Sequence, residues 1–315
     1  MKHKEWHQNV LTMSADGMSS RKISKITGIP KSTIIDFLAK FKSESETHWY
    51  DDSVVKLKMP KILLLDLESA PSQAYIWRRW KENIPQARII SEGYLLTYSA
   101  KWLGENTIIA NRIIDKECDY QIVKELWELY NDADIVIAHN LNKFDQPLLF
   151  ARMIQHGFEP PSPTKSVDTL VIAKKNFKFP SNALDSLAAY LNIPERKIQH
   201  SGFDLWVRCM NMEDAAFDEM LEYNVQDVVV LEQVYLKLRA WDKLAPNLAL
   251  YYNDISETKR CVCCGSTDLK LTKHSAYTAL SEFNTYQCNS CGKYNRSRSN
   301  LRSKEEMKNT LSNVI

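Results

Sequence analysis

The chain has 315 residues, of which 44% are hydrophobic and 25% are charged, as in an ordinary globular protein. No apolar run approaches the roughly 20 residues that a membrane-spanning helix needs, and the first residues lack the apolar segment of a signal peptide. These features exclude membrane and secreted classes, so we expect a cytoplasmic protein of a bacterium or of a phage-infected host cell, with no membrane partner.

The net charge of +2 conceals an uneven distribution of charge along the chain. Residues 1–60 carry 10 basic and 7 acidic side chains, residues 61–259 carry 22 and 28, and residues 260–315 carry 9 and 4. Basic ends favour a polyanionic partner, whereas an acidic middle repels one unless metal ions neutralise it locally. We therefore expect DNA, or RNA, as the partner, while the oligomeric state is left open.

The N-terminal part is predicted to form a small helical domain. Ser19 or Ser20 is expected to cap a short helix. Ile23 and Ile26 lie on that helix, and Gly28 permits the turn that follows it. A second helix then begins and buries its apolar side chains at helical spacing.

This pattern resembles the helix-turn-helix of the resolvase and homeodomain-like type, in which the second helix enters the major groove of DNA. The resemblance places the domain at residues 1–45, and residues 46–60 are predicted to be a polar linker. It implies DNA contacts from residues of both helices: Arg21, Lys22, Lys25, Lys31, Ser32 and Thr33. A helical hairpin used only for packing or dimerisation is the alternative.

The next stretch, residues 61–68 (KILLLDLE), is predicted to be a buried strand that ends in two carboxylates. Side chains alternate between the two faces of a strand, so Asp66 and Glu68 point the same way. Two like charges at one point are unfavourable unless a cation lies between them, and carboxylates suit Mg²⁺ and Mn²⁺. A strand end that dips into solvent is the alternative.

Residues 77–81 (WRRWK) alternate aromatic and basic side chains shortly after this strand. One interpretation is a segment that stacks on a single-stranded nucleic acid and contacts its phosphates. The other is an amphipathic helix whose aromatic side chains pack against the core.

The following segments change between strand and helix patterns. Strands are predicted at residues 94–102 and 107–114, a helix at 120–130 and a further strand at 135–138. Strand, strand, strand, helix, strand is the opening order of a ribonuclease-H-like fold, a mixed sheet flanked by helices. We therefore expect an α/β domain at residues 61–245.

Further polar residues are placed at predicted helices of this domain. Asp145 opens a helix next to the carboxyl edge of a strand, where ligands bind in open α/β sheets. Tyr223 and Asp227 are four residues apart on a long helix predicted at about residues 212–238, so they share one face. Asp168 is predicted to cap a helix, with a contact near the site as the alternative.

Asp-x-Glu on a strand, Asn-x-Asn-x-Phe-Asp opening a helix and Tyr-x-x-x-Asp on a late helix resemble the three motifs of the DEDDy 3′–5′ exonucleases. Residues 61–242 are similar to the proofreading domains of family B DNA polymerases and to their free-standing phage and bacterial relatives. The resemblance implies a two-metal 3′–5′ exonuclease that acts on DNA at single-stranded or frayed 3′ ends. It implies that two Mg²⁺ or Mn²⁺ ions are held by four acids: Asp66, Glu68, Asp145 and Asp227.

The same resemblance gives roles to individual residues. Tyr223 is expected to orient the attacking water, and Glu68 is expected to contact the terminal 3′ hydroxyl as well. Asn140 is expected to help hold the nucleic-acid backbone or the nucleotide. A histidine subtype has its water-orienting group five residues before the last aspartate, where this chain has Glu222, so Tyr223 favours the tyrosine subtype.

Two other functions share parts of this pattern. A sequence-specific DNA-binding regulator would use the helix-turn-helix and carry an inactive nuclease core. A structure-selective endonuclease or a transposase-like enzyme would share the fold, although transposases lack the Tyr-x-x-x-Asp pair.

Five of the seven cysteines lie close together near the C-terminus. Two Cys-x-x-Cys pairs, each followed by glycine, resemble a zinc ribbon at residues 260–300, and residues 246–259 are predicted to be a linker. We expect one structural Zn²⁺ held by four thiolates: Cys261, Cys264, Cys288 and Cys291. Cys263 is an alternative ligand in place of Cys261 or Cys264.

Basic residues continue beyond the second cysteine pair. Arg296 and Arg298 are expected to contact phosphates, and residues 301–315 are expected to be a basic tail. A tail that only improves solubility is the alternative.

Overall fold

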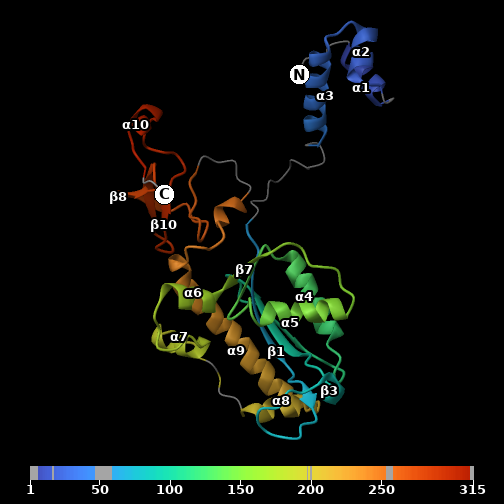
Figure 1. Ribbon diagram of the computed structural model, residues 1–315, viewed down its shortest axis with the longest axis vertical. Helices are drawn as coiled ribbons and strands as arrows, with labels where there is room; N and C mark the ends of the chain where they lie inside the picture. The colour runs from blue at the N-terminus through green and yellow to red at the C-terminus, as the bar shows by residue number, and fades with distance from the viewer. Residues whose placement is uncertain are drawn as a thin grey trace. The chain divides into compact units, whose positions relative to one another are not determined.

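The computed structural model describes residues 6–15, 18–46, 59–196, 198, 201–252 and 258–312. The chain divides into two compact units, Met1–Leu57 and Lys58–Ile315 (Figure 1). Most of the predicted linker at residues 46–60, part of the linker at 246–259 and the last three residues of the tail lie outside the described residues. Among the described residues, no helix combines the length and the apolar composition needed to cross a membrane.

The first unit contains three helices: α1 (Trp6–Ala15), α2 (Ser20–Thr27) and α3 (Lys31–Glu46). Its centre is formed by Val10, Ile23 and Ile34, one from each helix, all 0% exposed. Ser19 caps α2 by accepting a hydrogen bond from the backbone amide of Lys22, as the sequence predicts.

A short turn at residues 28–30 joins α2 to α3. Gly28 ends α2 with a φ of 71°, a left-handed conformation that glycine adopts without strain, and its amide bonds to the carbonyl of Ser24. Ile26, the other apolar residue that the sequence places on this helix, is 54% exposed. DNA binding by this unit stays a prediction.

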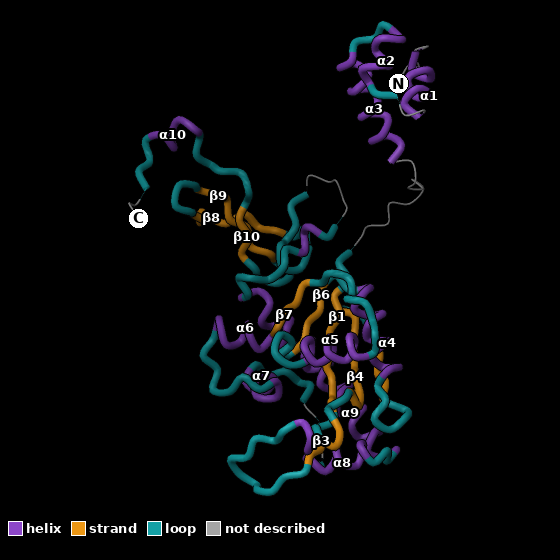
Figure 2. Tube along the Cα trace, turned by 45° about the vertical axis from the view of Figure 1, so that its right-hand side comes forward, coloured by secondary structure: helices purple, strands orange, loops and turns teal. Residues whose placement is uncertain are grey.

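The second unit is built on a five-stranded sheet with the strand order β5-β4-β1-β6-β7. Its strands in chain order are β1 (Ile62–Ser69), β4 (Leu95–Trp102), β5 (Ile108–Arg112), β6 (Ile135–Ala138) and β7 (Lys165–Asp168). The strands β1, β6 and β7 are parallel, whereas β4 pairs antiparallel with both β1 and β5. Figure 2 shows β7, β6, β1 and β4 side by side. The predicted mixed sheet is therefore confirmed.

Helices cover both faces of this sheet (Figure 1). On one face lie α4 (Tyr120–Asp132) and α5 (Asp145–Gln155), whereas α8 (Phe203–Met210) packs against α9. On the other face lie α6 (Thr169–Asn176), α7 (Leu184–Tyr190) and the later turns of α9 (Asp214–Leu238).

The side chains of β1 alternate between the two layers of the core. Leu63, Leu65 and Leu67 pack in the cluster that contains α4 and α5, whereas Ile62 and Leu64 pack in the cluster that contains α9. Burial of each such side chain stabilises the fold by about 1.5–3 kcal/mol. Since the even-numbered positions face α9, the alternation carries the two acids of β1 toward the same helix.

Residues 70–94 connect β1 to β4 and form a small extension of the hairpin that these two strands make. The extension contains β2 (Gln73–Ala74), the 3-10 turn η2 (Gln86–Arg88) and β3 (Ile89–Ser91). Residues 77–81 form bends rather than a helix, and Trp77 and Trp80 are 87% and 79% exposed. The amphipathic-helix interpretation of this segment is therefore wrong.

The C-terminal part carries a three-stranded sheet with the order β10-β9-β8. Its elements are β8 (Leu269–Tyr277), β9 (Glu282–Cys288), β10 (Tyr294–Arg296) and a short helix α10 (Lys304–Lys308). The helix α10 falls in the predicted tail and begins with a capping box between Ser303 and Glu306.

Candidate active site

Two acids stand at the end of β1 where that strand passes α9. Asp66 and Glu68 are half-buried and alternate with the buried Leu67, so both lie on the α9 face of the sheet. Strand β6 pairs with β1 only as far as Leu64. The acids therefore lie past the carboxyl end of a neighbouring parallel strand, the edge at which α/β sheets bind ligands.

Helix α9 brings a third acid to the same point. Asp227 is only 2% exposed, and its carboxylate oxygen lies within 4.8 Å of carboxylate oxygens of Asp66 and Glu68. Small side-chain rotations would bring such oxygens to one Mg²⁺ or Mn²⁺ ion, for which Mg–O bonds are about 2.0–2.1 Å. Three converging carboxylates that repel one another fit a divalent cation.

Asp145 approaches the same strand from another element. It is the first residue of α5, is 3% exposed, and accepts a hydrogen bond from the backbone amide of Leu67, the residue between the two acids of β1. Burial and, to a lesser extent, the nearby charge of Asp168 raise the pKa of Asp145 to about 7, although backbone amides, among them that of Leu67, act to lower it. Its carboxylate is not among the three that lie within 4.8 Å, so it borders this cluster rather than joining it.

A buried asparagine orients the first acid. Asn224 is 0% exposed, and its side-chain amide donates a 2.6 Å hydrogen bond to Oδ2 of Asp66. The hydroxyl of Ser99 on β4 donates to the backbone carbonyl of Asn224, and that of Thr97 donates to its side-chain oxygen. Sequence analysis did not identify Asn224, although it lies three residues before Asp227 and therefore on the same side of the helix.

Asp168 organises the loop that precedes Asp145. It caps α6, as predicted, by accepting hydrogen bonds from the amides of Leu170 and Val171. It also accepts hydrogen bonds from the amides of Asn140 and Asn142, at 3.0 and 3.1 Å. This second set of bonds fixes the loop between β6 and α5, in which Asn140 adopts a left-handed φ of 78°.

The predicted water-orienting residue lies on the same helix as Asp227. Tyr223 is half-buried and precedes Asp227 by about one turn of α9, whereas Glu222, the position of the histidine subtype, is exposed. The burial difference favours Tyr223 as the residue that faces the acids.

The structure brings the four predicted zinc ligands together. One sulfur atom from each of the four cysteines lies within 4.8 Å of the others: Cys261, Cys264, Cys288 and Cys291. The Cys261–Cys291 and Cys264–Cys288 sulfur distances are both 3.6 Å, and four sulfurs bonded to Zn²⁺ at about 2.3 Å are separated by about 3.8 Å. The donor set therefore fits a tetrahedral zinc ion.

Two glycines and one asparagine shape this cysteine cluster. Gly265 and Gly292 both have positive φ, and the amide of each bonds to the carbonyl of the first cysteine of its pair. Asn295, which sequence analysis missed, accepts from the amide of Val262 and thereby links the first cysteine turn to β10. Cys263 is buried outside the group of four sulfurs.

The predicted nucleic-acid contacts are polar and solvent-exposed except Asn140, which is half-buried. Five of them lie in the first unit: Arg21, Lys22, Lys31, Ser32 and Thr33. Arg298 is exposed, and the guanidinium of Arg296 lies 4.3 Å from the centre of the Phe283 ring. These side chains have the exposure that a phosphate contact needs.

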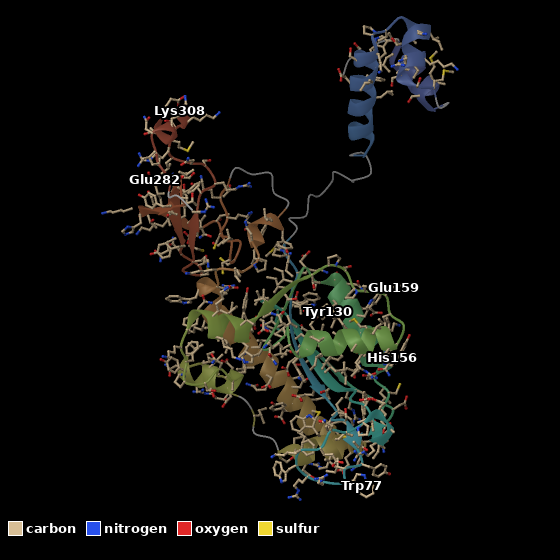
Figure 3. The ribbon with its side chains drawn as sticks, in the orientation of Figure 1. Trp77, Tyr130, His156, Glu159, Glu282 and Lys308 are labelled. Atoms are coloured by element: carbon tan, nitrogen blue, oxygen red, sulfur yellow. The ribbon has the colours of Figure 1, made fainter. Side chains whose placement is uncertain are left out.

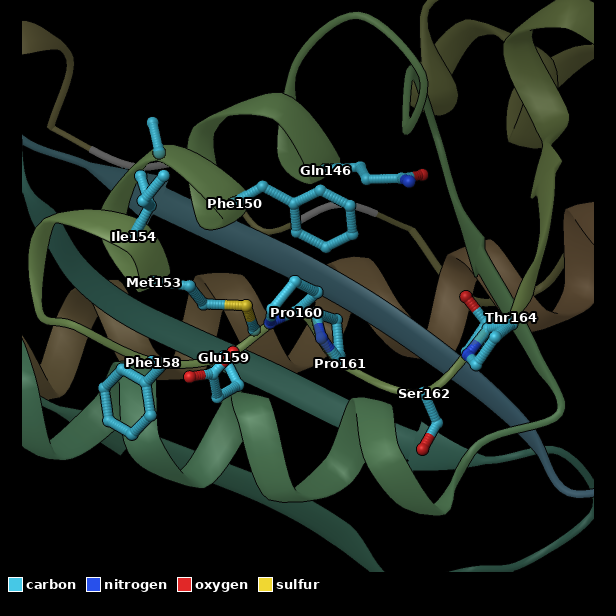
Figure 4. Close-up of a pocket in the computed structure, with 12 residues that line it drawn as sticks. Gln146, Phe150, Met153, Ile154, Phe158, Glu159, Pro160, Pro161, Ser162 and Thr164 are labelled. Atoms are coloured by element: carbon cyan, nitrogen blue, oxygen red, sulfur yellow. The ribbon is translucent and has the colours of Figure 1, made fainter.

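A pocket of about 600 Å³ lies between α5 and residues 158–164 (Figure 4). Its walls are mainly apolar side chains such as Phe150, Met153 and Pro160. None of the converging acids lines it, so it is separate from the candidate metal centre.

The comparisons with known proteins agree with this architecture. Residues 93–239 match the sequence family described as the RNase_H superfamily. The central domain is ribonuclease-H-like. The matched part of this ribonuclease-H-like domain contains Asp145, Tyr223 and Asp227 and begins after β1, so it does not include Asp66 and Glu68.

One solved structure that resembles the chain is the family B DNA polymerase from the hyperthermophilic archaeon Pyrobaculum calidifontis. The sequence identity is 14% and the TM-score 0.40, and the similarity covers 58% of this chain and 26% of that polymerase chain. The chain therefore spans about a quarter of the polymerase. No curated protein matches.

Proposed function

We propose that the ribonuclease-H-like domain is a metal-dependent 3′–5′ exonuclease that hydrolyses DNA at single-stranded or frayed 3′ ends. The observation that carries this proposal is the convergence of Asp66, Glu68 and Asp227 from two distant segments. Asp145 accepts a hydrogen bond from the amide of the residue between the two acids of β1. A cluster of this kind would destabilise the fold unless cations neutralised it.

The acids would hold two Mg²⁺ or Mn²⁺ ions. Asp66, Glu68 and Asp227 form one group of ligands, and Asp145 borders it at the open edge of β1. Bound divalent ions would lower the pKa of a water and stabilise the charge on the leaving 3′ oxygen. Asn224 keeps Asp66 in the orientation that this arrangement requires.

Tyr223 and Glu68 would act on the substrate side. The phenol of Tyr223, one turn before Asp227, can hold the attacking water by a hydrogen bond. Glu68 lies nearest to the end of β1 and can accept a hydrogen bond from the terminal 3′ hydroxyl. These roles follow from the similarity of the three motifs to those of the DEDDy exonucleases.

The two ends of the chain would hold the substrate. The first unit would bind duplex DNA through α3, with Lys31, Ser32 and Thr33 toward bases, while the ribbon would be stabilised by one Zn²⁺ and offer Arg296 and Arg298 to phosphates. The basic ends of the chain would attract a polyanion, whereas the acidic central part would bind it only when cations neutralise the acids.

The direct test uses 5′-labelled DNA and RNA strands, incubated with the full chain with and without Mn²⁺. We expect a ladder that shortens from the 3′ end of DNA only with the metal. Asp227→Asn should abolish the ladder, whereas Asp218→Asn, an exposed acid on the same helix, should leave it intact. Cleavage by Asp227→Asn at the wild-type rate, or internal cuts in place of a ladder, would reject the proposal.

A further inference from the structure

The extension between β1 and β4 rises from the strand end that carries Glu68. Ser69 of β1 pairs with Leu95 of β4, and residues 70–94 between them close this hairpin. The amide of Tyr75 bonds to the carbonyl of Arg88 beyond the β2–β3 pair, so the two strands of the extension remain together up to its tip. Figure 3 shows Trp77 at the lower end of the domain.

The tip exposes large aromatic side chains. Tyr75, Trp77 and Trp80 are 72%, 87% and 79% exposed, although aromatic side chains of this size are largely buried in most proteins. None of the three is needed for the two main core clusters, which contain other residues. Three exposed rings within six residues indicate a surface that binds a flat or apolar partner.

The same tip presents positive charge. Arg78, Arg79 and Lys81 are exposed and alternate with the two tryptophans. The acid that follows them, Glu82, is turned inward: its carboxylate accepts hydrogen bonds from the amides of Trp77 and Arg78, at 3.0 and 2.7 Å.

Glu82 also holds the tip in a defined shape. It forms an ion pair with Arg88 at the base of the extension. The amide of Arg78 and the Arg88 side chain lower the pKa of Glu82, so the carboxylate stays charged and its bonds stay formed at neutral pH. Because the backbone is fixed in this way, the aromatic rings are presented at little cost in conformational entropy.

We propose that residues 75–81 bind unpaired nucleotides upstream of the 3′ end, with bases stacked on Trp77 and Trp80 and phosphates against Arg78, Arg79 and Lys81. This inference rests on the proposed exonuclease function, which sets the 3′ end at the acids. Proteins bind single strands without regard to sequence through aromatic rings interleaved with basic side chains, because every base has a flat face and every nucleotide has a phosphate.

The geometry limits how far upstream the contact lies. Nine residues separate Glu68 from Trp77, and an extended chain of that length reaches at most about 30 Å. A stacked strand rises about 3.4 Å per nucleotide, so the aromatic tip lies at most about nine nucleotides from the 3′ end. A strand of about sixteen nucleotides is therefore long enough to reach from the acids to the tip.

The test measures binding of fluorescein-labelled DNA strands of about four and about sixteen nucleotides to the full chain without divalent ions. Stacking contributes about 1–3 kcal/mol per base, so the double variant W77L/W80L should bind the long strand at least about tenfold more weakly. W77F/W80F should retain most of the affinity, and the strand of about four nucleotides, which offers fewer bases and phosphates, should bind the wild type more weakly than the long strand does. Trp241→Leu, which removes another exposed tryptophan, is the positional control.

A second variant tests the contribution of the basic side chains at the tip. R78Q/R79Q should lower the slope of log affinity against log salt for the long strand by about 1.4, at about 0.7 per phosphate contact. Equal long-strand affinities of wild type and W77L/W80L would overturn the proposal. It would also be overturned if W77L/W80L bound DNA as the wild type does but lost binding to anionic lipid vesicles.

The two proposals fail in different ways. Continued Mn²⁺-dependent digestion with no difference between W77L/W80L and wild type would reject the stacking surface alone. Tryptophan-dependent binding of the long strand by a protein that never digests it would reject the exonuclease alone. Because the substituted side chains are exposed, unchanged thermal unfolding of W77L/W80L should exclude misfolding as the cause.

Discussion

Asn224 donates a 2.6 Å hydrogen bond to Asp66 and thereby ties α9 to the strand end on which the acids converge. The asparagine is completely buried, and its own backbone carbonyl is held by Ser99. A short bond between a fixed amide and a carboxylate restricts the carboxylate to one orientation. Asn224 therefore belongs to the machinery of the candidate metal centre although it carries no charge.

Removing this bond should weaken the site without unfolding the domain. Asn224→Leu keeps the branching and the number of side-chain heavy atoms but removes this hydrogen bond to Asp66, so we expect about 10–100-fold slower digestion and a higher Mn²⁺ concentration for half-maximal rate. Kinetics over a Mn²⁺ titration measure both quantities. Glu222→Ala, an exposed change on the same helix, is the control. An unchanged Mn²⁺ requirement in Asn224→Leu would show that the bond has only a structural role.

Asp145 should be essential for hydrolysis but dispensable for folding. In Asp145→Asn the remaining side-chain oxygen can still accept from the amide of Leu67, while the charge is lost. We expect a decrease in digestion of more than about 100-fold with an unchanged unfolding midpoint. Activity within about tenfold of wild type would remove Asp145 from the set of metal ligands.

Asp119 should stabilise the domain in a manner that depends on pH. Its carboxylate is 0% exposed and accepts hydrogen bonds from both Nε and Nη2 of Arg152, each 2.7 Å, and from the amide of Leu95. Burial opposes ionisation, but the bonds from Arg152 and from His156 outweigh it and lower the pKa of Asp119 below its ordinary value of 3.8. Asp119→Ala should therefore cost about 3–5 kcal/mol at neutral pH.

The sign of the pH dependence follows from the lowered pKa. The stabilisation by Asp119 is fully present above the unfolded pKa and is lost as the pH falls through the lower, folded pKa. Urea unfolding should thus show a wide gap between wild type and Asp119→Ala at pH 7 that narrows below pH 3.8. Glu128→Gln, an exposed partner of Lys124, should change stability by less than about 1 kcal/mol. A gap that widens in acid would contradict this account.

Zinc content should distinguish two adjacent cysteines. Cys264→Ser removes one of four sulfurs that lie within 4.8 Å of one another, so we expect loss of bound zinc and a destabilised ribbon. Cys263→Ser changes a neighbouring sulfur outside the group and should retain about one zinc per chain. Elemental analysis of the purified variants gives the answer, and the reverse pattern would show that Cys263 is the ligand.

The elements that carry the acids could be predicted because their signals are local. A continuous apolar run followed by alternating acids is sufficient for β1, and Tyr223 and Asp227 follow from helical spacing on α9. The cysteine cluster is equally local, since two pairs with glycine turns indicate one metal site.

The residues that sequence analysis missed are linked to partners far along the chain. Asn224 is 158 positions from Asp66, and a lone asparagine within a helix carries no signal that names its acceptor. Residues 77–81 were ambiguous because tryptophans three apart also fit one face of a helix. The bends at residues 77–81 and the exposure of both tryptophans, neither of which the sequence reveals, decide against that helix.

Diffraction from Mn²⁺-soaked crystals, recorded at the manganese absorption edge, tests the central claim most directly. The account predicts one anomalous peak among the carboxylates of Asp66, Glu68 and Asp227 and a second beside Asp145. Crystals of active protein in which manganese lies elsewhere, with these four carboxylates unliganded, would contradict it.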